Sequence, residues 1–183
     1  MKRVCIVLAA AVALTSCGSA SDGKFTLTSP ALDNGGNLAQ KYAGNDPQNT
    51  NCDGRNVSIP LEWKNPPPGT KSFTIFMSDP VGRGGLGMID WIAYDIPPAK
   101  RAFVEGEANH PGDFIGGMNT PGTKLYYGPC PPIGDEPHPY TIVLIATDIP
   151  VGALKPGMAA NELSAALTGH TLASTSFVAK YRS

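Results

Sequence analysis

The chain has 183 residues, and its 14 Lys and Arg residues nearly balance its 15 Asp and Glu residues, giving a formal net charge of −1. Because no basic run or excess is present, we expect no nucleic-acid partner. Glycine and proline are frequent, at 21 and 18 residues, while hydrophobic residues still make up 42%, which is typical of a loop-rich folded domain and excludes a disordered chain.

The N-terminal segment is predicted to be an export signal. Lys2 and Arg3 precede an apolar stretch over 4–14, which is shorter than the about 20 residues that a helix needs to span a bilayer. Residues 14–17 then read LTSC, which resembles the lipobox of bacterial lipoproteins.

That resemblance implies cleavage before Cys17 and lipidation of its side chain, and several acyl chains make membrane attachment effectively permanent. We therefore expect a lipoprotein signal peptide over 1–16, a lipidated cysteine with a short tether over 17–23, and one domain over 24–183. The expected location is the bacterial cell envelope, on the extracytoplasmic side of a membrane and facing the periplasm in a Gram-negative cell. An ordinary signal peptide with an unrelated cysteine is the alternative.

Predicted strands dominate the domain, because its segments alternate apolar and polar residues or carry β-branched and aromatic runs without a breaker. In chain order they lie over 24–29, 59–63, 72–78, 88–96, 140–147 and 175–182. Simple alternation within the fourth segment puts Ile89 and Trp91 on one face. Ile92 and Ile96 then fall near the other face.

The segment 140–147 is almost continuously apolar, which suits a central strand buried on both faces. One helix is predicted, over 158–170, because Leu163 and Leu167 fall at helical spacing and Gly169 supplies a stop. Together the elements predict a mainly β fold, a β-sandwich with a helix near the C-terminus.

Two connections, over about 30–58 and 98–139, are longer than a compact domain needs, so we expect them to carry the function. With the signal peptide removed and Cys17 lipidated, Cys52 in the first connection and Cys130 in the second are the cysteines that remain. Outside the cytoplasm such a pair usually forms a disulfide. A reactive Cys130 is the alternative, although no basic helix terminus is expected near it.

Four polar residues at predicted strand ends are candidates for a site. They are Asp79, Asp90, His138 and Tyr140. Each also has a simpler interpretation, because Asp-Pro is a common turn, an aspartate in a strand usually faces water, and a histidine between prolines is usually a loop residue. Only their grouping at strand ends beside turn-rich loops favours a functional site.

Other motifs are weaker. The GRGGLG stretch over 82–87 lacks the lysine and hydroxyl residue of a phosphate-binding loop, and we expect a flexible hairpin connection that does not open a helix. The histidines, at 110, 138 and 170, show no metal-ligand spacing, and no serine-hydrolase elbow occurs. We therefore expect no metal and no cofactor.

Six segments, in this order, carry a resemblance to a known family: FTLTSPAL, CDGRNVSIPLEW, PPGTKSFTIFMSDP, DWIAYDIP, YYGPCPPIGDEPHPY and GHTLA. The fifth is the most specific, because Gly-Pro-x-Pro-Pro, a further glycine and His-x-Tyr follow one another there. From about 25 to 182 the chain resembles the phosphatidylethanolamine-binding protein family, in its YbhB/YbcL-like branch, related to Raf kinase inhibitor protein. The resemblance implies a Greek-key β-sandwich with a small pocket for phosphate-like and phosphoethanolamine-like groups.

By this resemblance the ligand-binding residues are Asp79, Asp90, Gly128, Cys130, Pro131, His138 and Tyr140. The prolines would hold the segment 126–140 rigid so that its backbone N–H groups face an anion. The chain departs from the family twice: the usual Asp-Pro-Asp-x-Pro reads DPVGR over 79–83, and Asp90 stands where a histidine is usual. Because two carboxyl groups would make the pocket more negative, we expect weakened phosphate affinity and a preference for a cationic group.

The expected function is therefore non-enzymatic binding of a small anionic or zwitterionic headgroup by a lipid-anchored envelope protein. The alternative is an inhibitor or modulator of an extracytoplasmic hydrolase or another protein partner. Asp79, Asp90 and His138 could in principle perform acid–base catalysis. Since no activated nucleophile is evident, we expect no enzyme.

Overall fold

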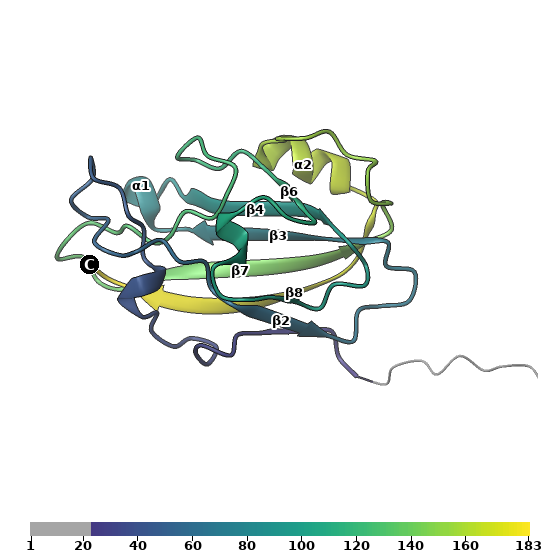
Figure 1. Ribbon diagram of the computed structural model, residues 1–183, viewed down its shortest axis with the longest axis horizontal. Helices are drawn as coiled ribbons and strands as arrows, with labels where there is room; N and C mark the ends of the chain where they lie inside the picture. Colours follow the sequence, from purple (N-terminus) through teal and green to yellow (C-terminus); the bar gives the residue numbers. More distant parts are fainter. Residues whose placement is uncertain (1–22) are drawn as a thin grey trace, which may run out of the picture.

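The computed structural model describes residues 23–183, so the predicted signal peptide over 1–16, the lipidation site Cys17 and most of the tether lie outside the described residues. Two antiparallel sheets form the fold (Figure 1), a three-stranded sheet in the order β1-β2-β5 and a five-stranded sheet in the order β6-β4-β3-β7-β8. The strands are β1 Thr26–Thr28, β2 Leu61–Lys64, β3 Ser72–Asp79, β4 Met88–Ile96, β5 Ala102–Phe103, β6 Ile115–Gly116, β7 His138–Thr147 and β8 Thr171–Tyr181. The predicted mainly β sandwich is confirmed.

The core lies between the two sheets. Leu61, Trp63 and Phe103 face it from the small sheet, and the inward residues of β3, β4, β7 and β8 face it from the large one. Edge-to-face contacts join the aromatic residues, with the Trp63 and Phe73 ring centroids 5.6 Å apart. Such pairs are typical of a well-packed sandwich core.

A second, smaller apolar cluster covers the outer face of the large sheet. There helix α2, Ala160–Leu167, packs Leu163 and Leu167 against Ile92 and Tyr94 of β4. The helix is shorter than predicted at both ends. Thr168 already has an extended backbone and Gly169 has a φ of 82°, so the predicted stop at Gly169 is confirmed, while the last helical residue is Leu167 and β8 follows from Thr171.

Strand β4 does not alternate as the sequence predicts. Its pairing with β3 shifts register twice, between Met77 and Ser78 and between Phe73 and Ile75, so β4 carries one extra residue at each place. A β-bulge places two successive residues on the same side of a strand. As a result Ile89 packs in the outer cluster and Ile96 in the inner core, opposite to the predicted faces of both.

Strand β7 is central, between β3 and β8, but it is not buried on both faces. Residues such as Tyr140, Ile142 and Leu144 are buried toward the core, while the residues between them are half-buried. Strand β8 begins four residues earlier than predicted, because its first residues, Thr171 to Ser174, lie largely exposed along the sheet edge and show no apolar alternation.

The predicted long connections contain only short elements. These are the 3₁₀ turns η1, Gln40–Tyr42, and η2, Glu107–Asn109, with β5 and β6. The GRGGLG stretch joins β3 to β4 as predicted, but it forms one irregular helical turn, α1, Gly82–Gly85, with a φ of 57° at Arg83. Within residues 23–183 no helix is both long and apolar enough to cross a membrane.

Candidate functional site

A buried Asp–His pair lies at the end of the sandwich where β3 ends and β7 begins. Asp79 Oδ2 is 2.7 Å from His138 Nδ1, and the backbone N–H of Val81 donates to Asp79 Oδ1 at 2.9 Å. Asp79 therefore acts as a turn former and as the partner of His138 at once. Gly82 leaves room for this turn, because a Cβ there would lie 3.0 Å from Asp79 Oδ2.

The pair fixes how His138 can interact with a ligand. A carboxylate only accepts hydrogen bonds, so the Nδ1 of His138 carries a hydrogen and donates to Asp79. The other ring nitrogen, Nε2, lies 3.4 Å from Asp135 Oδ2. Asp135 has a half-exposed side chain, so displacing it would free Nε2 to meet a ligand oxygen or N–H group.

Asp90 reaches the same place because of the first bulge in β4. Regular alternation would put Asp90 outside and Trp91 inside, whereas the bulge turns both inward. Asp90 is 1% exposed, and its Oδ2 has no hydrogen-bond partner in the part of the chain that the structure describes. Burial raises the pKa of Asp90 well above its ordinary value, and the charge of Asp79 raises it further. A hydrogen bond from the backbone of Asp79 acts in the opposite direction, with a smaller effect.

This burial corrects one expectation from the sequence. A raised pKa favours the neutral carboxylic acid over the carboxylate. The site is therefore less negative than two ionised aspartates would make it. A buried carboxyl oxygen without a partner is rare in folded proteins and indicates a place where a ligand donor could bind.

Three tyrosines lie near the acids. Burial raises the pKa of Tyr140, and the charges of Asp79 and Asp90 act in the same direction. Burial also raises the pKa values of Tyr126 and Tyr127; the charge of Asp90 contributes in Tyr126 and, after that of Asp46, in Tyr127. The Tyr126 hydroxyl donates to the carbonyl of Tyr42, and the Tyr127 hydroxyl lies 3.4 Å from Cys52 Sγ. The sequence analysis missed these two tyrosines and Asp135, and the available signal was their position in the same turn-rich segment.

The predicted proline-rich wall is present beside these tyrosines. The structure joins Cys52 and Cys130, whose Cα atoms are 4.7 Å apart, in a disulfide. The N–H of Gly128 donates to Asn56 Oδ1 at 2.7 Å, and Pro131 has no N–H to offer. The N–H of Gly128 is therefore not free to face an anion, and the expectation for the other backbone N–H groups of this wall stays a prediction.

Close backbone packing is the reason for glycine at 128. A Cβ there would lie 2.3 Å from the carbonyl oxygen of Tyr42 and 2.7 Å from the carbonyl carbon of Ala43. We expect Gly128→Ala to lower the free energy of unfolding by roughly 1–3 kcal/mol in urea denaturation, since overpacking forces the backbone apart. Gly112→Ala, where the nearest atom would be 3.4 Å away, is the control and should change it little. Equal stability of both variants would contradict the packing argument.

The site is closed rather than open. Asp79, His138 and Tyr140 are 3%, 4% and 1% exposed, so the expected pocket between strand tips is a nearly covered cluster. Only a small group can enter, and Asp135 or its loop must move first. Among residues 23–183, no group of three or more histidine, cysteine or acidic side chains could hold a metal ion.

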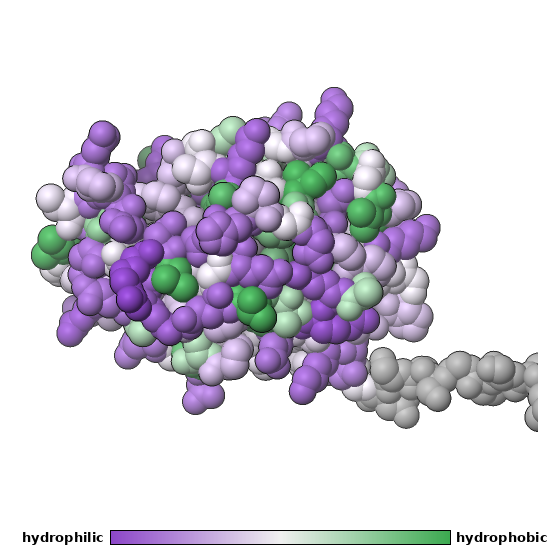
Figure 2. Space-filling view, viewed as in Figure 1, coloured by the Kyte–Doolittle hydropathy of each residue, from purple (hydrophilic) through white to green (hydrophobic). Residues whose placement is uncertain are grey.

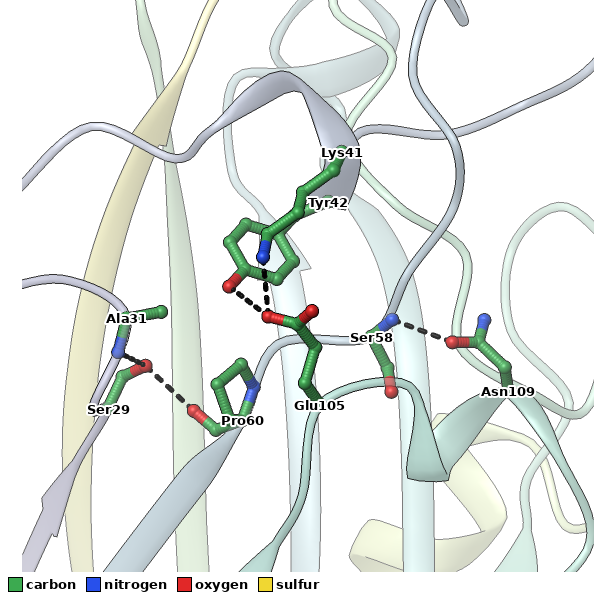
Figure 3. Close-up of polar contacts among 8 residues, drawn as sticks. All are labelled: Ser29, Ala31, Lys41, Tyr42, Ser58, Pro60, Glu105 and Asn109. Carbon is green, nitrogen blue, oxygen red and sulfur yellow. Dashed lines mark hydrogen bonds and ion pairs between the residues drawn. The ribbon is translucent and has the colours of Figure 1, made fainter.

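A groove of about 630 Å³ lies elsewhere, over the small sheet, and none of the seven predicted site residues lines it. At one end Lys41 Nζ and the Tyr42 hydroxyl both donate to Glu105 Oε2, each at 2.7 Å (Figure 3). At the other, Ser29 Oγ donates to the carbonyl of Pro60. Lys41, Tyr42 and Glu105 are therefore paired with one another, and no buried polar side-chain atom of the groove lining lacks a partner among the described residues, so nothing there indicates a ligand.

The sandwich and its buried Asp–His pair define a β-sandwich protein with a polar site at its strand ends. A family model described as Phosphatidylethanolamine-binding protein matches residues 28–182. The chain belongs to this family, and the resemblance to its YbhB/YbcL-like branch is confirmed.

Solved structures share the fold over most of the chain. YbcL from Escherichia coli is 25% identical with a TM-score of 0.78, covering 88% of this chain and 99% of that one. The homologue CT736 from Chlamydia trachomatis is 28% identical with a TM-score of 0.74, covering 87% and 97%. LppC of Mycobacterium tuberculosis, whose name describes it as a lipoprotein, is 30% identical over 133 residues, which are 70% of this chain and 60% of LppC.

Proposed function

We propose that this chain is a lipid-anchored envelope protein that binds a small phosphate- or phosphoethanolamine-like headgroup at the Asp79–His138 site, without catalysis. The family match and the similarity to LppC support this proposal. The observation that carries it is the buried Oδ2 of Asp90, which has no partner among the described residues and lies near Asp79, the carboxylate that holds the His138 imidazole in a fixed orientation.

The chemistry of the site favours a ligand with an ammonium end. An ammonium group donates to a carboxylate and stabilises its charged form, so it would supply the partner that Asp90 lacks. His138 Nε2, once Asp135 has moved, would meet the phosphate end of the same ligand. A bare phosphate could accept a hydrogen bond from Asp90 in its neutral form, but it brings no positive charge to a site that already contains the Asp79 carboxylate, and we propose that it binds more weakly than a ligand with an ammonium end.

Isothermal titration of phosphate, ethanolamine and phosphoethanolamine into the wild type and into Asp90→His tests the proposal. We expect Asp90→His to weaken ethanolamine binding about tenfold or more, the scale of one lost hydrogen bond to a charged group, and to tighten phosphate binding. Glu136→Gln, which removes an exposed acid from the same loop, is the control and should leave both affinities unchanged. Tighter phosphate binding by the wild type than by Asp90→His would refute the proposed preference.

A further inference from the structure

The described chain begins at the end of the sandwich opposite the candidate site (Figure 1). The Asn65 side chain donates to the carbonyl of Lys24, and the Phe25 ring stacks on Phe73 with centroids 6.3 Å apart. Phe73 lies near the start of β3 and Asp79 is its last residue. At about 3.3 Å per residue the two ends of this strand are more than 20 Å apart.

Four exposed basic residues surround the beginning of the described chain, and we refer to them as the basic end: Lys24, Lys64, Lys71 and Arg101. Lys64 and Arg101 line the same hollow of about 460 Å³. The Arg101 guanidinium lies 5.8 Å from the Phe73 ring centre, and the Lys71 N–H donates to the carbonyl of Thr147 at the end of β7.

The basic end keeps a positive balance. Within residues 23–183 none of its four cations takes part in an ion pair. Glu62 shares the hollow with Lys64 and Arg101, and Asp148 lies beyond Thr147 but is bonded to His170 at 2.8 Å. Asp95, next to the Ile96 that pairs with Phe73, is buried and accepts from the Gly152 N–H, and Asp113 is paired with Lys100. Among the described residues one acid without a polar partner, Glu62, therefore faces the four unpaired cations, and largely hydrophilic surface lies around the place where the described chain begins (Figure 2).

The end with the candidate site carries charges of both signs. Asp79 and Asp135 lie next to the two ring nitrogens of His138, and the exposed Lys180 and Arg182 lie at the end of β8 and just beyond it. The two ends therefore differ in where the described chain begins, which is beside the four cations of the basic end (Figure 1). An anionic surface close to that point attracts these cations within a Debye length of about 8–10 Å.

We propose that the basic end rests on the anionic phospholipid bilayer that anchors the chain and holds the candidate site away from that bilayer. This inference rests on the proposed anchoring through Cys17. The six residues from Cys17 to Gly23 span at most about 20 Å, so the anchor delivers this end to the headgroup region. Acyl chains and a basic cluster are known to act together in membrane attachment.

One consequence concerns the ligand. A site held at the far end of the strands opens toward the aqueous compartment. The headgroup-like molecule that it takes is therefore one that reaches it through water, rather than a phospholipid still embedded in the anchoring bilayer.

Lysine footprinting tests the orientation. The lipidated full-length protein is reconstituted on phosphatidylcholine vesicles with or without about 30% phosphatidylglycerol, which gives the negative surface potential of an anionic leaflet. It is then labelled with an amine-reactive reagent and analysed by mass spectrometry. We expect Lys24, Lys64 and Lys71 to be labelled about fivefold less on the anionic vesicles, the ratio typical of one basic residue near an anionic surface. Lys180, at the opposite end, should be labelled equally on both.

Matched double variants separate the basic end from charge in general. Lys64→Gln with Lys71→Gln should remove most of the protection of Lys24, whereas Lys180→Gln with Arg182→Gln should leave it intact. Equal protection of Lys24 and Lys180, or none on anionic vesicles, overturns the inference. If mass spectrometry finds no lipid on Cys17, the proposed anchoring fails, and footprinting of that chain mixed with anionic vesicles still decides whether the basic end contacts them.

Discussion

Replacing Cys52 and Cys130 by serine is expected to lower the free energy of unfolding by about 4 kcal/mol, because the disulfide closes a loop of 78 residues and restricts the unfolded chain. The folded state contributes as well. A Cβ on Gly44 would lie 2.2 Å from Cys130 Sγ, so the backbone of the first long connection packs directly on the bridge. Loss of the bridge releases the wall that carries Gly128 and the two site tyrosines.

Urea denaturation of the double variant, with and without reductant, measures this effect. Dithiothreitol should destabilise the wild type to the level of the variant and leave the variant unchanged. A wild type whose midpoint does not respond to reductant, together with two free thiols on titration, would show that the cysteines are not bridged in solution.

The sequence predicts the framework well where apolar pattern and burial agree. The strand 88–96 has the same bounds in the structure, and the strand 72–78 differs by one residue, since both are central and buried. The first four residues of β8, Thr171 to Ser174, escape prediction, because they pair with β7 through their backbone and bury little apolar surface. A strand held at a sheet edge mainly by backbone hydrogen bonds need not alternate apolar and polar residues, so the sequence pattern does not reveal it.

The candidate site is less predictable than the fold. The grouping of Asp79 and His138 is predictable from their places at strand ends. The pairing of Cys52 with Cys130 is predictable because they are the two cysteines left after the predicted signal-peptide removal and lipidation of Cys17. The inward position of Asp90 depends on a bulge, however. A bulge leaves no recognisable motif in the sequence, so the face on which Asp90 lies could not be predicted. The closure of the site by Asp135 depends on a loop conformation that only the coordinates show.

The stability of the wild type should fall with rising pH relative to Asp90→Asn. Because burial raises the pKa of Asp90 in the folded state above its value in the unfolded chain, the folded protein binds this proton more tightly. The resulting stabilisation is fully present below the unfolded pKa of about 3.9 and is lost as pH rises through the raised pKa. Over that window the loss approaches about 1.4 kcal/mol per pH unit.

Urea denaturation of both proteins from about pH 4.5 to 8, a range chosen to begin just above the ordinary carboxyl pKa, measures the difference, with the exposed Asp33→Asn as a control that should follow the wild type. Because asparagine has the same shape and no charge, its advantage over aspartate at high pH isolates the cost of ionising an unpartnered buried acid. A saturating ammonium ligand should reduce this advantage, since it stabilises the carboxylate and binds only the folded protein. A wild type that is more stable than Asp90→Asn at pH 8 without ligand would mean that Asp90 already has a partner in the folded chain, and the ammonium-binding role proposed for it would then lose its physical basis.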